Sequence, residues 1–95
     1  MGVSFGPAAL RDLRSILAHL AHESPRAASE FSAAIIDLWE RLSEFPDAGA
    51  PAGTRGHRFV MISGFPYKVF YRPIGQSELR VVRIRHARRR PLRFS

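Results

Sequence analysis

The feature that most constrains the fold of this chain is a change in its hydrophobic period. Apolar residues recur every three or four positions over residues 8–22 and again over residues 25–45, which predicts two amphipathic helices. From His57 onward apolar and polar residues alternate, which predicts strands. The stretch Pro46–Gly56 between these two regions is rich in proline, glycine and alanine, and we interpret it as the crossing from helices to sheet.

Ser24 and Pro25 determine how the two helices are connected. Serine is a preferred N-cap residue and proline a preferred first helical residue, so the second helix begins at Pro25, directly after the first ends near His22. Pro46 then ends the second helix. Because the connection is so short, the two helices must form an antiparallel hairpin.

The second half of the chain predicts a small sheet. Turn residues separate three alternating segments, which are expected to form an antiparallel meander: His57–Ser63, Tyr67–Arg72 and Leu79–His86. Pro73–Gln76 is expected to be the second turn, and Val3–Phe5 a short edge strand. We therefore predict a single α+β domain over residues 1–95, with an N-terminal helical hairpin packed on one face of a small antiparallel β-sheet.

The charge is divided unevenly along the chain. Residues 1–50 carry four arginines and seven acidic residues, a net charge of −3, whereas residues 51–95 carry ten arginines, Lys68 and a single acid, Glu78, a net charge of +10. The sheet face left uncovered by the helices should therefore be basic, with Arg and Lys interleaved with Phe or Val. Such a surface attracts nucleic acid or an acidic protein segment.

Several classes of protein are excluded or disfavoured by what the sequence lacks. There is no cysteine, which excludes disulfide scaffolds and thiol nucleophiles and makes the cytoplasm the simplest location. No segment has the length and apolarity of a membrane span, and no nucleotide-phosphate loop motif occurs. His19, His22 and Glu23 lie close together, but no further ligand has a recognisable metal-site spacing. We expect neither a metal nor another cofactor.

The remaining candidate functional residues are cations of the second half, joined by one histidine. The basic group is expected to bind an acidic partner or nucleic acid, and the residues alone leave both open: Arg55, Arg58, Lys68, Arg83, Arg85, Arg88, Arg89 and Arg90. RNA cleavage on this surface would need a proton acceptor, for which His86 is the candidate, with Tyr67 or Tyr71 as donor. The alternative, which we favour, is that His86 is a buried structural imidazole at the end of a strand.

Five segments occur in an order and spacing that resemble the RelE/ParE family of type II toxin–antitoxin toxins. The resemblance covers nearly the whole chain and is carried by Ser24–Phe31, Leu42 with Phe45-Pro46 and Gly49, Gly53-Thr54-Arg55, Phe65–Arg72 and Val82–Arg89. It implies a helical hairpin packed on a small antiparallel sheet. It also implies a cytoplasmic growth inhibitor, of the kind that acts in plasmid stabilisation, which forms a hetero-oligomer with an acidic antitoxin.

The resemblance leaves two activities to choose between. RelE-like members cut mRNA on the ribosome, and by strand matching Lys68 and Arg88, with His86, would then be the catalytic residues; ParE-like members inhibit DNA gyrase without being enzymes. Where the nuclease pattern has a C-terminal tyrosine this chain has Phe94, and the loop 48–53 lacks the lysines of the nucleases. We therefore expect a ParE-like gyrase inhibitor. The alternatives are a ribosome-dependent endoribonuclease and an inactive relic that only binds its antitoxin.

Overall fold

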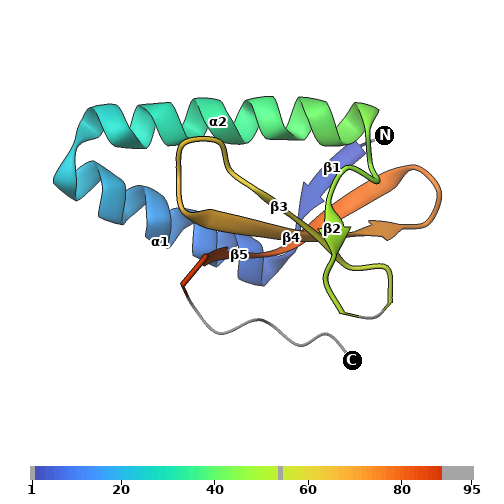
Figure 1. Cartoon of the computed structure of the whole chain (residues 1–95). Coiled ribbons are helices and arrows are strands. Elements are labelled where there is room, and N and C mark those ends of the chain that lie inside the picture. Colours follow the sequence, from blue (N-terminus) through green and yellow to red (C-terminus); the bar gives the residue numbers. More distant parts are fainter. Residues whose placement is uncertain (1, 54, 89–95) are drawn as a thin grey trace.

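The structure, a computed structural model, describes residues 2–53 and 55–88. Two helices, α1 (Pro7–Glu23) and α2 (Pro25–Glu44), pack against each other as an antiparallel hairpin (Figure 1). The predicted helices are confirmed to within two residues at each end. Neither helix, among the described residues, is both long and apolar enough to cross a membrane.

A single residue, Ser24, connects the two helices. Its backbone N–H donates to the carbonyl of Leu20 at 2.7 Å and ends α1. Its hydroxyl accepts from the backbone N–H of Ala27 at 3.3 Å and begins α2, with Pro25 as the first helical residue. Serine and proline thus have the capping roles that the sequence predicts for them.

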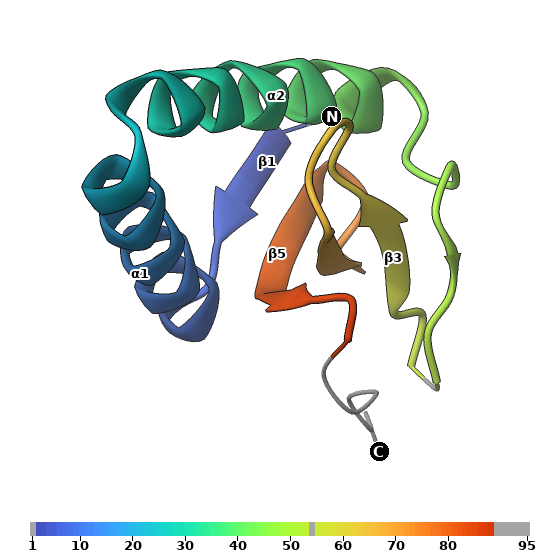
Figure 2. The same ribbon diagram turned by 60° about the vertical axis from the view of Figure 1, so that its left-hand side comes forward.

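The sheet has five strands among the described residues, in the order β1-β5-β4-β3-β2. Its strands are β1 (Gly2–Phe5), β2 (Ala50–Pro51), β3 (Arg58–Met61), β4 (Tyr67–Ile74) and β5 (Glu78–His86). The meander β3-β4-β5 is antiparallel, as predicted, with Lys68 opposite Arg85 and Val69 opposite Ile84. Figure 2 shows the helical hairpin on one side of this sheet.

The segment predicted to be a loop contains the two-residue strand β2, which pairs with β3, and the sheet differs from the prediction at two further places. First, it is mixed, because β1 pairs in parallel with β5, with Gly2 opposite Glu78. The connection from β1 to the meander passes through the helices, and such a crossover allows parallel pairing. Second, β4 continues through Pro73 to Ile74, so the turn predicted from residue 73 starts later. β3 pairs with β4 only as far as Tyr71, so the missing N–H of Pro73 removes no bond between these strands.

The core lies between the helical hairpin and one face of the sheet. Phe31 and Leu42 of α2 and Val69 and Val81 of the sheet are almost fully buried there. Phe5 of β1 packs on Trp39 with ring centroids 4.9 Å apart, so the edge strand contributes to the same core. Alternation places one set of strand residues in this core, and the other set on the opposite face of the sheet.

Tyr71 holds the segment after α2 against the sheet. Its side chain has no exposed surface, and its hydroxyl donates to the carbonyl of Pro46 and accepts from the N–H of Gly49, both at 2.9 Å. Burial raises the pKa of Tyr71, and the Gly49 hydrogen bond acts in the opposite direction. The backbone of Gly49 lies so close to the Tyr71 side chain that a Cβ at residue 49 would be 2.6 Å from the Tyr71 hydroxyl.

Candidate functional site

The face of the sheet opposite the helices carries a row of cations, and we call it the open face. Lys68 and Arg85 are cross-strand partners in β4 and β5, and so are Arg72 and Arg80. Paired residues lie on the same side of a sheet, and Lys68, Phe70 and Arg72 alternate with the core residues Val69 and Tyr71. The open face therefore comprises Phe59, Met61, Lys68, Phe70, Arg72, Arg80 and Arg85, and the register places Arg83, the partner of Phe70, on the same face.

Aromatic rings support the cations on this face. The Lys68 ammonium lies 4.7 Å from the centroid of the Phe59 ring, and the Phe59 and Phe70 rings are 5.9 Å apart. Arg80 is held by Glu78 at 3.3 Å. Within the described ranges, Lys68, Arg72 and Arg85 have no carboxylate within 4.0 Å. The arrangement of basic residues interleaved with phenylalanine is the one that the sequence predicts, and three of its cations can still pair with an acidic partner.

Arg83 belongs to a different environment, although it is on the same strand. Its Nε and Nη2 donate to the two carboxylate oxygens of Asp12 on α1, at 2.8 and 3.1 Å. The Asp12 carboxylate also accepts from the backbone N–H of Ile84 at 2.9 Å. The hydrogen bond to Asp12 raises the pKa of Arg83. This bidentate pair joins α1 to β5, so the guanidinium of Arg83 contributes to the fold rather than to the row of cations on the open face.

Arg58 is likewise engaged inside the molecule. It is the cross-strand partner of Tyr71, which places it on the helix side of the sheet. Its Nη1 donates to the carbonyl of Gly49 at 2.7 Å, and its Nε lies 3.9 Å from Asp47. Arg58 therefore holds the same segment as Tyr71. The expectation that Arg58 shares one surface with Lys68 and Arg85 does not match its position, whereas Arg83 is on their face by register but its guanidinium is bound to Asp12.

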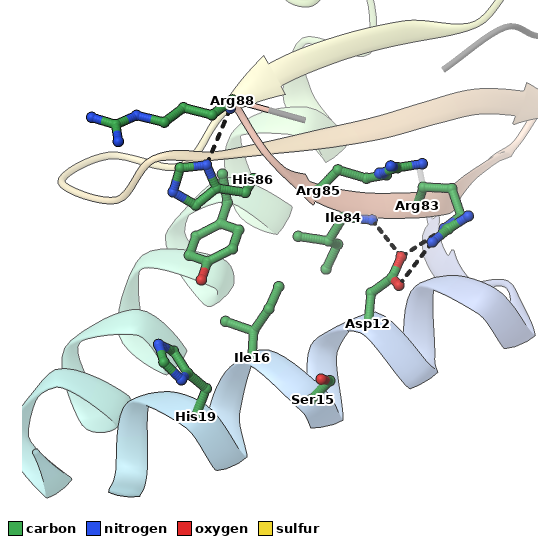
Figure 3. Close-up of a pocket in the computed structure, with 10 residues that line it drawn as sticks. Asp12, Ser15, Ile16, His19, Arg83, Ile84, Arg85, His86 and Arg88 are labelled. Atoms are coloured by element: carbon green, nitrogen blue, oxygen red, sulfur yellow. Dashed lines mark hydrogen bonds and ion pairs between the residues drawn. The ribbon is translucent and has the colours of Figure 1, made fainter. Parts of the chain in front are cut away.

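A pocket opens between α1 and the end of β5, beside the Asp12–Arg83 pair (Figure 3). Its volume is about 510 Å³. Figure 3 shows Ile16 and His19 rising from α1 towards β5, while Arg85 and Arg88 extend in opposite directions along the strand. The lining combines apolar, cationic and neutral polar side chains: Asp12, Ser15, Ile16, His19, Tyr67, Arg83, Ile84, Arg85, His86 and Arg88.

His86 is half-buried at the end of β5, and its ring contacts Tyr67 edge-on with centroids 5.4 Å apart. Its Nδ1 accepts a hydrogen bond from the backbone N–H of Arg88 at 3.1 Å. This bond assigns the proton of the neutral ring to Nε2 and uses the lone pair of Nδ1. His86 thus has a structural hydrogen bond at the end of the strand but is not buried as predicted, and its ring offers a donor to the pocket.

Of the residues considered for RNA cleavage, Tyr67, His86 and Arg88 line the α1–β5 pocket together, whereas Lys68 and Tyr71 do not line it. Lys68 lies on the open face, whereas His86 pairs with Tyr67 on the helix side of the sheet. Arg88 is exposed just beyond β5. The hydroxyl of Tyr71, the second candidate proton donor, is buried and bound to backbone groups.

The other predicted residues are dispersed or lie outside the described part. Arg55 is exposed in the loop before β3, with a positive φ of 62°. Arg89 and Arg90 lie outside the described residues. Arg72 and Arg80 were missed as candidates, although alternation from Lys68 places Arg72 on the same face. The described part of the chain contains no cluster of three or more His, Asp or Glu residues that could hold a metal ion.

Comparison with known proteins defines first the fold and then the family. The structure resembles that of a chain described as "Chromosomal ParDE TA system from P. aeruginosa", with a TM-score of 0.74, 22% sequence identity, and coverage of 90% of this chain and 95% of that chain. A search of curated protein sequences gave no significant match. The sequence model of the ParE toxin of the type II toxin–antitoxin system parDE matches residues 3–91. The chain belongs to this ParE toxin family, which confirms the ParE-like branch of the predicted resemblance.

Proposed function

We propose that this protein is a toxin that inhibits DNA gyrase without catalysis, acts in the cytoplasm and is neutralised by an acidic antitoxin. The observation that carries the proposal is the separation of Lys68 and His86 on opposite faces of the sheet. A ribonuclease needs its phosphate-binding cations and its proton-transfer groups around one scissile bond. The arrangement in this chain suits docking rather than catalysis.

The state of His86 supports the same proposal. A general base must have a free lone pair directed at the proton that it removes. In His86 the Nδ1 lone pair accepts from Arg88, and Nε2 carries the proton. The neutral imidazole in this arrangement is a donor and not a base.

The unpaired cations of the open face support the choice of an acidic partner. Lys68, Arg72 and Arg85 face away from the core and have no carboxylate within 4.0 Å in the described ranges. A surface of this kind accelerates encounter with an acidic chain and is sensitive to salt. We expect the partner to be a small acidic protein encoded next to this gene.

Expression of the chain with and without that neighbouring protein tests the proposal. Alone, the chain should slow growth and raise DNA-damage signalling, and the purified chain should abolish supercoiling by purified gyrase while cellular mRNA stays whole. Coexpression of the acidic neighbour should restore growth. Cuts in mRNA at ribosome-occupied codons, with gyrase unaffected, would show instead that the chain is an endoribonuclease. Normal growth despite soluble expression would show that it is an inactive relic.

A further inference from the structure

The α1–β5 pocket has an apolar floor suited to an aliphatic chain. Ile16 of α1 and Ile84 of β5 line it, and both are more than nine-tenths buried. The ring of Tyr67 adds apolar surface and is itself packed edge-on against Phe31 at 5.7 Å. The floor is therefore fixed by core residues, and the pocket does not depend on mobile side chains for its shape.

The polar groups of the pocket are hydrogen-bond donors. The bond from Arg88 to Nδ1 leaves the Nε2–H of His86 as a donor. The Tyr67 hydroxyl has no hydrogen-bond partner among the described residues. Donors that flank an apolar floor select a ligand with an apolar stem and an acceptor at its end.

The charge at the pocket favours an anionic acceptor. Asp12, the only carboxylate among the described residues that line the pocket, is already bound by the guanidinium of Arg83 and by the backbone of Ile84. Arg85 and Arg88 at the rim have no carboxylate within 4.0 Å in the described part of the chain. The uncompensated charge at the pocket is therefore positive.

We infer that this pocket receives a glutamate side chain of the acidic antitoxin, an inference that rests on the proposed function. The two methylene groups of glutamate would pack on Ile16 and Ile84, and its carboxylate would accept from His86 and Tyr67. Aspartate has a shorter stem, and phosphate has none. The pocket and the open face share Arg85, so the antitoxin would contact both the helix side and the open face of the sheet.

The first test blocks the pocket from its helical wall. Ser15 is exposed on α1 and lines the pocket, so Ser15→Phe fills it without disturbing the core. The matched control is Ser29→Phe, at an exposed position of α2 that does not line the pocket. Affinity for the purified acidic neighbour should fall at least ~10-fold for Ser15→Phe and stay unchanged for Ser29→Phe.

The second test identifies the group that binds. His86→Leu should lose at least ~10-fold in affinity, whereas His86→Gln, which keeps an N–H at the position of Nε2, should retain most of it. One Glu→Gln change in the antitoxin should weaken binding to the wild-type chain but cause no further loss with His86→Leu, as a double-mutant cycle measures. Circular dichroism of each variant confirms that it is folded.

The outcomes separate the inference from the proposed function. If the wild-type chain binds its acidic neighbour but Ser15→Phe binds equally well, the pocket is not the glutamate site, while the proposed function stands. Strict additivity of every Glu→Gln change with His86→Leu would also overturn the inference. If the wild-type chain does not bind that neighbour at all, the proposed antitoxin and this inference fail together.

Discussion

Arg58 and Arg83 are bound by groups of the same chain, whereas Arg72 and Arg85 on the open face have no described carboxylate within 4.0 Å. All four residues come from the basic second half of the sequence, so composition alone does not show which of them bind within the chain and which are available to a partner. The difference arises because Asp12 and Asp47 lie beside Arg83 and Arg58, while Glu78 of β5 pairs with Arg80. Cations in such a chain therefore divide into those that stabilise the fold and those available to a partner.

The largest expected effect that tests this division is at Gly49, on the helix side. In Gly49→Ala the new Cβ would lie 2.6 Å from the Tyr71 hydroxyl and 2.7 Å from the Phe59 carbonyl, so the segment bound by Tyr71 must move. We expect the free energy of unfolding in urea to fall by about 3 kcal/mol or more. Gly2→Ala, whose Cβ would lie 3.8 Å from its nearest neighbour, is the control and should change it little. Equal stability of both variants would show that the Tyr71 contact is not tight.

The next effect concerns the pair that joins α1 to β5. Asp12→Ala removes both hydrogen bonds to Arg83 and the acceptor of the Ile84 N–H, and should lower the free energy of unfolding by about 2 kcal/mol. The control is Glu30→Ala, which breaks the exposed Arg26–Glu30 pair and should cost less than ~0.5 kcal/mol. If thermal or urea unfolding gives the two variants the same loss, Arg83 is not a structural cation.

A smaller effect is expected from pH. Burial raises the pKa of Tyr71, so in alkali the unfolded chain ionises before the folded one. The contribution of the neutral Tyr71 side chain to the free energy of unfolding is complete below about pH 10. It is lost as the pH rises towards the folded-state pKa, by up to ~1.4 kcal/mol per pH unit. Between pH 9 and 11, the free energy of unfolding measured in urea should therefore fall more steeply with pH for the wild type than for Tyr71→Phe. Parallel curves would contradict this assignment.

The smallest effect on stability is expected on the open face. Lys68→Ala and Arg72→Ala remove cations that have no described carboxylate partner, and each should change the free energy of unfolding by less than ~0.5 kcal/mol. The same changes should weaken binding of the acidic neighbour, with a smaller difference from the wild type at high salt. A destabilisation as large as that of Asp12→Ala would remove the distinction between the two sets of cations.

Much of the fold follows from the sequence because local rules determine it. Ser24 and Pro25 set the helical hairpin, and alternation after His57 sets the meander. The parallel pairing of β1 with β5 could not be derived, since nothing local to Val3 or Leu79 specifies a partner so distant in the chain. Alternation also places Arg72 on the same face as Lys68, so the sequence was sufficient to identify Arg72 as a candidate.

The candidate site is harder to predict, for the same reason. Alternation identifies the open face, but it cannot show that Asp12 on α1 reaches Arg83. Nor does any pattern in the sequence reveal that the backbone of Arg88 determines which nitrogen of His86 carries the proton. The first contact depends on how α1 packs against the end of β5, and the second depends on the turn that follows β5, which only the folded structure shows.

The pairing of β1 with β5 also affects how the protein is made. Gly2 and Glu78 become neighbours only after the ribosome has released β5, so the edge of the sheet stays incomplete during most of translation. Contacts between residues so far apart in sequence slow folding, and they leave apolar strand surface accessible meanwhile. We therefore expect the nascent chain to complete its sheet only after β5 has emerged, which gives a partner translated alongside it time to meet it.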